Sequence, residues 1–474
     1  MSAGEICSDV PPRIDASADV VVIGAGACGL TAALRAKAAG ADVLVLERDA
    51  SPSGSTSMSS GFIPAPATRF QQAVGVNDDT PELFEADLLA KSKGKSEPTL
   101  TCLASQTIGP ALEWLADAHG LEWVVLDDFL YPGHSRHRMH AVPEKTGAAL
   151  LTRLLSAAEN ADIPIVTEAR VTRLYVAPDS NDANDSTRIT AVEITRPDGQ
   201  VEILGCSALI LACNGYGGNR ALVAEHIPEI AGGLYYGHEG NTGDALLWGV
   251  SLGADLRHLS GYQGHGSLAH PHGILISWAL MMEGGIQVNG SGQRFSNEHG
   301  GYSEQAVHVL QQPGGIAWNI FDRTRHDFAL SFPDYQDAVG AGAIRQAESL
   351  TSLAQVTSLP EEPLRDTLTQ VEACQRGASA DPYGRDFSTK AGLTPPYYAV
   401  KVTGALFHTQ GGMMIDRTAR VLDATGKPFA NLFAGGGAAC GVSGPDVSGY
   451  LSGNGLLTAI AFGYLAGTFS AKVA

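Results

Sequence analysis

The sequence predicts an α/β fold in which one domain is split along the chain by an inserted α+β domain. The first observation is residues 18–47, which alternate as strand, glycine-rich turn, helix and second strand. The second is that this alternation stops at about residue 261, and the third is that the last seventy residues resume it. A βαβ unit of this kind is typical of a Rossmann-type domain. We therefore expect residues 1–260 and 405–474 to form one domain and 261–404 an inserted second domain.

The glycine-rich turn carries the spacing Gly24, Gly26, Gly29 directly after the apolar run 20–23. One glycine permits the sharp turn, one lets the backbone approach a pyrophosphate, and one lets the helix pack against the strand. The helix start then offers unpaired N–H groups and a positive dipole to phosphates. Glu47, at the end of the second strand, is placed to accept hydrogen bonds from a ribose. An acid there favours FAD or NAD over NADP.

Composition narrows the class of partner. The chain has 474 residues, enough for two or more domains, and a formal net charge of −19, which disfavours nucleic acid and anionic membrane surfaces. The first residues lack the pattern of a secretory signal, and the apolar stretch 455–467 is too short to span a bilayer. The seven cysteines form no CxxC or CxxCH pattern, so we expect a cytoplasmic protein without an iron–sulfur cluster or c-type haem.

Local signals predict further elements along the chain. Thr80 followed by Pro81 marks a helix start, and Pro197 to Gly199 marks a hairpin. Helices are expected at about 109–119, 146–161, 349–376 and 452–465, strands at 163–167 and 171–176, and a solvated loop at 179–186.

A basic, aromatic patch covers residues 129–140 in this otherwise acidic chain. It contains three histidines, His134, His137 and His140. Their spacing matches no strong metal-ligand pattern, so we expect a loop facing substrate or an ordinary surface loop, and no metal.

The chain resembles the FAD flavoproteins that include fumarate reductases, succinate dehydrogenases and 3-ketosteroid 1-dehydrogenases. The matching motifs occur in family order along nearly the whole chain. They are VVVIGAGACGLTAA, GSTSMSSG, LACNGYGGN, NTGDA, QVNGSGQRFSNE (287–298), DPYGR (381–385), PPYYAV (395–400), HTQGGMMID (408–416) and NLFAGGG. The resemblance implies FAD as the cofactor, in a domain split around a capping domain. No histidine stands in residues 54–61, where covalent members carry one, so it implies non-covalent FAD.

The resemblance also implies which residues contact FAD. The glycine turn and Glu47 would hold the ADP end, and the loop after the second strand would line the flavin. The helix starting near Gly453 would direct its N–H groups at the flavin edge that becomes negative on reduction. The full predicted set is Gly24, Gly26, Ala27, Gly29, Glu47, Arg48, Ser55, Thr56, Ser59, Gly61, Val171, Asn214, Gly215, Asp244, Gly436, Gly453, Gly455 and Leu456.

Departures from the family pattern indicate the subfamily. Fumarate reductases place an arginine proton donor a few residues beyond the RFxNE motif, and the corresponding residue here is Tyr302. The glutamate and arginine of their proton relay fall on Trp278 and Met281, and their substrate-clamping arginine falls on Tyr450. These positions, which handle dicarboxylates in fumarate reductases, are therefore uncharged here. His408 retains the fumarate-reductase-like histidine.

A tyrosine at this position after the RFxNE motif instead resembles the pattern of 3-ketosteroid 1-dehydrogenases and related cyclic-ketone dehydrogenases. They also carry a tyrosine before the last glycine-rich turn, as Tyr450 stands here, although a proline usually follows theirs and Leu451 follows this one. The resemblance implies that Tyr302 removes the proton beside the ketone while a hydride leaves the β-carbon for flavin N5. Tyr450 and N–H groups near Gly453–Gly455 would stabilise the developing oxyanion, and Tyr131 would assist Tyr302.

Three alternatives remain open from the sequence. The same fold operating in reverse would be an ene-reductase of an activated alkene. A flavoprotein subunit would dock a larger redox complex, although no linker, tail or cluster motif indicates one. A flavin oxidase would reduce O₂.

The expected substrate is a small cyclic ketone, either an oxocyclohexane such as 4-oxocyclohexanecarboxylate or a 3-ketosteroid. The smaller ketone is favoured because bulky side chains are available to narrow the pocket, with Arg136 or Arg138 as a candidate partner for a carboxylate. These bulky residues are Tyr262, Trp278, Met281, Met282 and Phe407. Electrons would leave to a diffusible acceptor such as O₂, a quinone or a redox protein.

Overall fold

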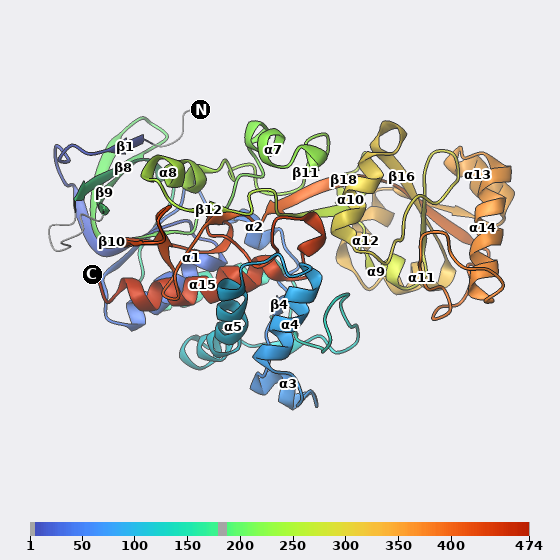
Figure 1. Cartoon of the computed structure of the whole chain (residues 1–474), viewed down its shortest axis with the longest axis horizontal. Helices are drawn as coiled ribbons and strands as arrows, with labels where there is room; N and C mark the ends of the chain where they lie inside the picture. The colour runs from blue at the N-terminus through green and yellow to red at the C-terminus, as the bar shows by residue number, and fades with distance from the viewer. Residues whose placement is uncertain (1–4, 179–186, 474) are drawn as a thin grey trace. The chain divides into compact units, whose positions relative to one another are not determined.

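The computed structural model describes residues 5–178 and 187–473, so the loop predicted at 179–186 lies outside the described residues. The chain divides into two compact units, and passes between them at 226–227, 236–237, 262–263 and 407–408. The first unit contains residues 1–226, 237–262 and 408–474, and the second contains 227–236 and 263–407. Figure 1 labels their elements.

The first unit is built on a nine-stranded sheet. Its parallel part contains β7, β3, β2, β10 and β21, while β8 and β9 form an antiparallel extension of β10. The strands of this unit are β1 (Glu5–Cys7), β2 (Ala16–Ile23), β3 (Val43–Leu46), β4 (Ile63–Pro64), β5 (Val124–Val125), β6 (Met139–Ala141), β7 (Ile165–Val166), β8 (Arg170–Pro178), β9 (Thr187–Thr195), β10 (Val201–Leu211), β12 (Leu256–Arg257), β19 (Gly412–Met413), β20 (Arg420–Leu422) and β21 (Pro428–Ala434).

Helices of the first unit cover this sheet and a smaller three-stranded sheet of β4, β6 and β5. They are α1 (Ala27–Ala38), α2 (Gly54–Ser57), α3 (Arg69–Ala73), α4 (Pro81–Lys91), α5 (Pro98–His119), α6 (Gly147–Asn160), α7 (Arg220–His226), α8 (Asp244–Leu252) and α15 (Asn454–Ser470). Thr80 caps α4 as predicted, because its hydroxyl accepts the N–H of Leu83. Helix α5 begins eleven residues earlier than expected and contains Pro110 in its interior.

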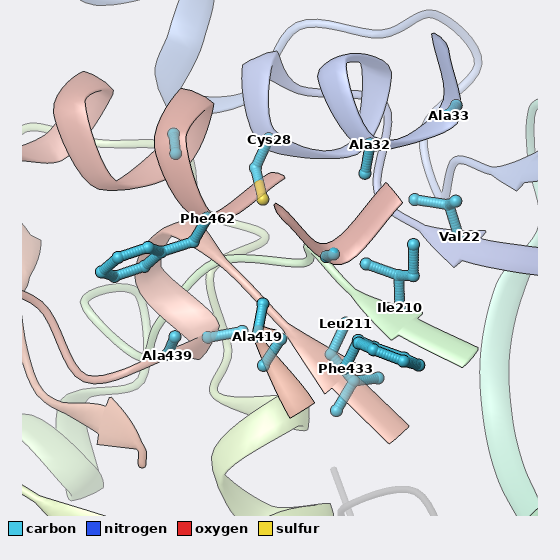
Figure 2. Close-up of a cluster of buried hydrophobic side chains, with 14 of the residues drawn as sticks. Val22, Cys28, Ala32, Ala33, Ile210, Leu211, Ala419, Phe433, Ala439 and Phe462 are labelled. Atoms are coloured by element: carbon cyan, nitrogen blue, oxygen red, sulfur yellow. The ribbon is translucent and has the colours of Figure 1, made fainter. Parts of the chain in front are cut away.

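The core of the first unit lies where α1 and α15 meet the sheet. Figure 2 shows Cys28 and Ala32 of α1 beside Ile210, Phe433 and Phe462. The two helices approach closely because α15 presents glycines to α1: a Cβ at Gly467 would lie 2.2 Å from the carbonyl oxygen of Ala32. This contact joins the N-terminal βαβ unit to the C-terminal helix, as the sequence pattern predicted.

The second unit is an α+β structure around a seven-stranded sheet with the order β14-β13-β18-β16-β15, to which β11 and β17 add through β18. Its strands are β11 (Leu234–Tyr235), β13 (Tyr262–Ala269), β14 (Ile274–Leu275), β15 (Ile286–Val288), β16 (Ile316–Asp322), β17 (Ile344–Ala347) and β18 (Tyr397–Thr409). Its helices are α9 (Ala279–Met282), α10 (Tyr302–Leu310), α11 (Arg323–Ala329), α12 (Pro333–Gly340), α13 (Leu350–Thr357) and α14 (Glu361–Gln375).

Two details of the second unit differ from the expectations. The single helix expected over 349–376 is two helices, α13 and α14, because Ser358 takes a left-handed conformation and Pro360 follows it. Residues 227–236, expected in the first part of the FAD-binding domain, group with the second unit because Leu234 and Tyr235 pair in parallel with β18.

Within the described residues no helix has the length and apolar character needed to cross a membrane.

Charged residues of the RFSNE motif form a buried ionic cluster in the second unit. Arg294 contacts Glu298 at 2.6 Å and Asp381 at 2.5 Å, and Arg385 contacts Glu298 at 3.1 Å. Burial alone would raise the pKa of Glu298, but the two arginines outweigh it and lower this pKa. The motif therefore ties the segment before α10 to residues 381–385.

We predict that Arg294→Met lowers the free energy of unfolding by about 3–5 kcal/mol, because it leaves two buried carboxylates without a main partner. The control Arg365→Met removes an exposed ion pair with Glu361 and should cost about 0.5 kcal/mol or less. Denaturant unfolding measures both. Equal losses for the two variants would show that the buried cluster does not stabilise the fold.

Candidate functional site

The glycine turn between β2 and α1 is closed by backbone contacts. Gly24 has a φ of +106°, and a Cβ at Gly29 would lie 1.8 Å from the Gly24 carbonyl oxygen. A Cβ at Gly26 would meet only the Thr56 hydroxyl, at 3.3 Å. Helix α1 has no side-chain cap at its start and no acid in its first turn. The turn therefore offers the open backbone and positive helix end that a pyrophosphate requires.

Glu47 links the end of β3 to this turn. Its Oε2 accepts the N–H of Ala25 at 3.0 Å, and its Oε1 accepts the N–H of Asp49 at 3.1 Å. A carboxylate has about four acceptor positions, so each oxygen retains capacity for a ribose hydroxyl. The next residue, Arg48, donates to the carbonyl oxygen of Gly240 at 2.7 Å and so holds the loop before α8.

The loop around α2 folds onto the start of α1. Thr56 Oγ1 accepts the N–H of Ala27 at 3.0 Å, so this N–H is already used within the protein. Ser59 donates to the carbonyl oxygen of Thr56 at 2.7 Å and accepts the N–H of Gly61 at 3.1 Å. Four predicted cofactor residues thus bond to one another, and the loop contacts the start of α1.

Further predicted cofactor residues lie at the ends of other strands. Asn214 follows β10 and donates to Ser55 Oγ at 2.8 Å, while its own oxygen accepts the N–H of Gly215. Asp244 begins α8 and accepts from the Thr242 hydroxyl at 3.1 Å. Gly436 follows β21, and a Cβ there would lie 3.4 Å from Cys28 Cβ. Val171 is buried in β8 and pairs with Ile194 of β9.

The start of α15 forms a second group of donors. Gly453 precedes the helix with a φ of +89°, no side chain caps it, and the N–H groups of Gly455 and Leu456 therefore point out of its first turn. The His408 ring lies against this turn, because a Cβ at Gly455 would be 2.9 Å from His408 Nε2. The rings of His408 and Tyr450 lie 5.5 Å apart, edge to face.

His408 is a neutral imidazole at physiological pH. Burial lowers its pKa to about 4. Its Nδ1 lies 3.0 Å from the Gln410 amide nitrogen, Gln410 accepts from Ser443, and Ser443 accepts from Asn454 at the start of α15. The first unit therefore brings together three predicted elements: Tyr450, His408 and the N-terminus of α15.

Tyr302 lies in the second unit as the first residue of α10. Its ring stacks on His265 of β13 with centroids 5.0 Å apart, and His265 stacks in turn on Phe407 at 5.3 Å. The Ser303 hydroxyl accepts the N–H of Gly264 at 2.7 Å and fixes the helix start to β13. Burial lowers the pKa of His265 to about 3, so this ring is also neutral.

Sequence reasoning missed several residues of these groups. His265 was not singled out, although a histidine between small residues in an apolar strand was an available signal. Two other residues lay inside matched motifs, but no role was predicted for them. Asn241 donates to Ser55 Oγ at 2.9 Å, and the Gln410 amide lies beside His408. Tyr262 and Met281 are fully buried, and Met281 belongs with Trp278 to one hydrophobic core of the second unit.

The hypothesis that Arg138 binds a substrate carboxylate is wrong. Its side chain is fully buried and pairs with Asp79 at 2.7 Å and Asp87 at 2.5 Å, which leaves it no access to a ligand. Arg136 pairs with Asp78 at 2.8 Å. Tyr131 lies in the first unit, with its ring 5.0 Å from that of Phe129, and its assistance to Tyr302 stays a prediction.

Two of the three histidines of the 129–140 patch, His134 and His140, have protein partners. His134 Nε2 lies 3.0 Å from the Ser452 carbonyl oxygen, and His140 Nε2 lies 2.7 Å from the Thr68 hydroxyl. Burial lowers the pKa of both to about 4. In the part of the chain that the structure describes, no group of three or more His, Cys, Asp or Glu residues is arranged to hold a metal ion.

Comparison with known proteins identifies the family. The model of the FAD binding domain family matches residues 19–456, and the chain therefore belongs to that family. The open glycine turn, the free capacity of Glu47 and the uncapped start of α15 fit FAD. The chain is an FAD-dependent oxidoreductase acting on CH–CH groups.

Individual relatives extend this finding. The probable fumarate reductase Ifc3 of Shewanella frigidimarina (strain NCIMB 400) is 29% identical over 96% of this chain and 74% of its own length. The 4-oxocyclohexanecarboxylate 2-dehydrogenase of Sinomonas cyclohexanicum is 26% identical over 89% of this chain and 87% of its own. The structure of 3-ketosteroid-delta4-(5alpha)-dehydrogenase from Rhodococcus jostii RHA1 has a TM-score of 0.78 over 99% of both chains; at 24% identity it shows the shared fold.

We predict that Gly29→Ala yields protein that retains little FAD, because the new methyl group would meet the Gly24 carbonyl oxygen at the turn. Overpacking of this kind also costs about 1–3 kcal/mol in stability. The ratio of flavin to protein absorbance measures FAD retention. Gly340→Ala is the matched control, since a Cβ there meets nothing within 4 Å. Full FAD retention by Gly29→Ala would exclude this turn as the pyrophosphate site.

Proposed function

We propose that the chain is a dehydrogenase that introduces a C=C bond α,β to the carbonyl group of a small cyclic ketone. The observation that carries the proposal is that Tyr302, a phenol, begins α10 a few residues after the RFSNE motif. Its ring neighbour His265 is neutral. The positions where fumarate reductases handle dicarboxylates are uncharged here, which favours a neutral reacting group over a dicarboxylate.

Buried arginines of the second unit support a phenol as the proton-handling group. Arg294 and Arg385 are engaged in the ionic cluster with Glu298. Arg325 bonds to Asp322 at 2.7 Å and to the carbonyl oxygen of Glu283 at 2.8 Å. Each of the three guanidinium groups already pairs with a carboxylate of the fold, which disfavours it as an acid towards substrate.

Each group has a role in the proposed reaction. Bound FAD supplies the hydride acceptor. Tyr302 takes the proton next to the carbonyl, with Tyr131 as its proposed assistant. Tyr450 and the N–H groups of Gly455 and Leu456 donate hydrogen bonds to the carbonyl oxygen as it gains charge, and one such donor contributes up to about 3–4 kcal/mol of barrier lowering. Neutral His408 packs beside them as a further donor or acceptor.

A monocyclic ketone is the proposed substrate. The Sinomonas relative is named for 4-oxocyclohexanecarboxylate and aligns with most of this chain at 26% identity. The aromatic group of Tyr302, His265 and Phe407 offers flat apolar surfaces suited to a ring. Electrons would then pass from the reduced flavin to a diffusible acceptor. The proposed location of the protein is the cytoplasm.

We predict that 4-oxocyclohexanecarboxylate bleaches the bound flavin in the absence of oxygen, and that Tyr302→Phe slows this bleaching at least about a hundredfold while FAD stays bound. Stopped-flow absorbance of the holoprotein measures the rate.

Tyr383→Phe provides the control for this experiment, since it removes the hydroxyl of a side chain 41% exposed in the same unit. It should bleach at the wild-type rate. Normal bleaching by Tyr302→Phe would exclude Tyr302 as the base. If a 3-ketosteroid bleaches the flavin and the monocyclic ketone does not, the substrate is a steroid and the proposed monocyclic ketone is wrong.

A second candidate function is reduction of an activated alkene by the same site. The 29% identity to the probable fumarate reductase and the presence of His408 favour it. Ketone desaturation and alkene reduction would use the same hydrogen-bond donors at the carbonyl oxygen. The reacting groups therefore do not by themselves favour one direction of the reaction.

We predict that turnover is faster with an oxidising dye and the saturated ketone than with a reduced dye and either fumarate or a cyclic enone. Anaerobic steady-state assays with matched dye concentrations compare the two directions. Faster turnover with the reduced dye would favour the ene-reductase. If fumarate were then the preferred alkene, the chain would be a fumarate reductase.

A further inference from the structure

The carbonyl group of Ser452, two residues before α15, is bonded to a histidine from a distant part of the first unit. His134 Nε2 lies 3.0 Å from the Ser452 carbonyl oxygen. A carbonyl oxygen only accepts hydrogen bonds, so Nε2 carries the proton of this imidazole and donates it. Ser452 is buried, with 7% of its surface exposed, and a buried carbonyl requires a hydrogen-bond partner. His134 supplies one from outside the helix.

The backbone by itself does not fix the direction of this carbonyl. Gly453 follows it with a φ of +89°, and glycine adopts positive and negative φ about equally readily. The peptide group between Ser452 and Gly453 is therefore free to turn over. A turned Ser452 carbonyl would face the first turn of α15, where the N–H groups of Gly455 and Leu456 lie three and four residues further on. Those are the spacings of 3₁₀-helical and α-helical hydrogen bonds.

The imidazole of His134 is held on its other sides. Its ring stacks on Phe84 of α4, with centroids 5.9 Å apart and an angle of 24° between the planes. Arg138 Nη1 lies 3.5 Å from His134 Nδ1, and Arg138 is itself fixed by Asp79 and Asp87. Burial and the charge of Arg138 lower the pKa of His134 to about 4. The ring is thus neutral, with Nε2 as its donor.

The turn that carries His134 also packs on the segment before α15. The N–H of His134 donates to the Tyr131 carbonyl oxygen at 3.0 Å and closes this turn. Gly133 lies within it with a φ of +86°, and a Cβ there would lie 2.6 Å from Leu451 Cδ1. Leu451 is the residue before Ser452. The ring and the backbone of this turn therefore hold the same short segment.

The first turns of α15 lie beside the glycine turn. A Cβ at Gly436 would lie 3.4 Å from Cys28 Cβ and 3.7 Å from Ala459 Cα. Cys28 belongs to the first turn of α1, and Ala459 follows Gly455 by four residues. A dinucleotide with its pyrophosphate at the start of α1 therefore has the start of α15 within reach of its remaining length.

We propose that His134 is a positioning residue that holds the Ser452 carbonyl away from the first turn of α15, and so keeps the positive end of this helix open towards bound FAD. Unpaired N–H groups and the helix dipole stabilise negative charge, and a carbonyl oxygen folded onto the turn would neutralise part of that effect. Because the flavin gains negative charge on reduction, an open helix end stabilises reduced FAD more than oxidised FAD. The inference depends on FAD binding and is independent of the ketone substrate.

The variants His134→Gln and His134→Met form a matched pair that tests this role. Their side chains have nearly the same length, but the glutamine amide donates a hydrogen bond and the methionine thioether does not. We expect His134→Met to weaken the binding of reduced FAD relative to oxidised FAD about three- to tenfold. This change lowers the midpoint potential of the flavin by about 15–30 mV, since tenfold corresponds to about 30 mV for a two-electron couple. His134→Gln should retain most of the wild-type potential.

The measurement is an anaerobic titration of the flavin spectrum in the holoprotein against a reference dye. No ketone is present, so the result does not depend on the proposed substrate. His134→Asn provides a second variant without the contact, because its shorter amide does not reach Ser452. It should shift the potential in the same direction as His134→Met, and it replaces that variant if the methionine variant does not retain FAD.

His140→Met is the control for a merely structural role. His140 is a second buried histidine of the same segment, but its Nε2 lies 2.7 Å from the Thr68 hydroxyl and not at the segment before α15. This variant should lower the melting temperature about as much as His134→Met and leave the midpoint potential unchanged. Equal potentials for His134→Met and His134→Gln, or the same shift in His140→Met, would overturn the proposal.

Discussion

Parallel pairing of β10 with both β2 and β21 is the constraint on which the first unit depends. Leu211 pairs with Ile23 on one side and with Ala434 on the other, so strands from three distant parts of the chain end at one edge. Loops that follow parallel strands meet at that edge. The glycine turn after β2, Asn214 after β10 and Gly436 after β21 therefore lie in one region.

Polar groups near the proposed cofactor site form hydrogen bonds with one another within the protein. Glu47 and Thr56 accept hydrogen bonds from backbone N–H groups of the glycine turn, and the amide groups of two asparagines donate hydrogen bonds to Ser55 Oγ. Buried or partly buried polar groups are costly when unpaired, so this pairing holds the loops in one arrangement. The groups left with unused capacity are few, and they suit a ligand that offers both hydroxyl groups and acceptor oxygens.

Neutral aromatic and imidazole groups surround the two tyrosines proposed for chemistry. Burial keeps His265 beside Tyr302 and His408 beside Tyr450 uncharged at physiological pH. Arg294 of the RFSNE motif is held by Glu298 and Asp381, and Arg385 is held by Glu298, which gives both arginines a structural role. Such surroundings suit a reaction in which charge appears transiently on a carbonyl oxygen.

The sequence by itself determined the α/β class, the split domain with its insertion, the glycine turn with Glu47, and the FAD family, because these depend on local spacing and on motif order. It also predicted the last helix, expected at about 452–465 and observed as α15 (Asn454–Ser470). Tertiary structure alone decided which polar side chains pair. Arg138 looked available in a basic patch, yet it is buried and paired with Asp79 and Asp87. Ser55 looked like one hydroxyl among several, yet it accepts hydrogen bonds from both Asn214 and Asn241. Such pairings join residues up to 186 positions apart, and no local pattern encodes a contact at that separation.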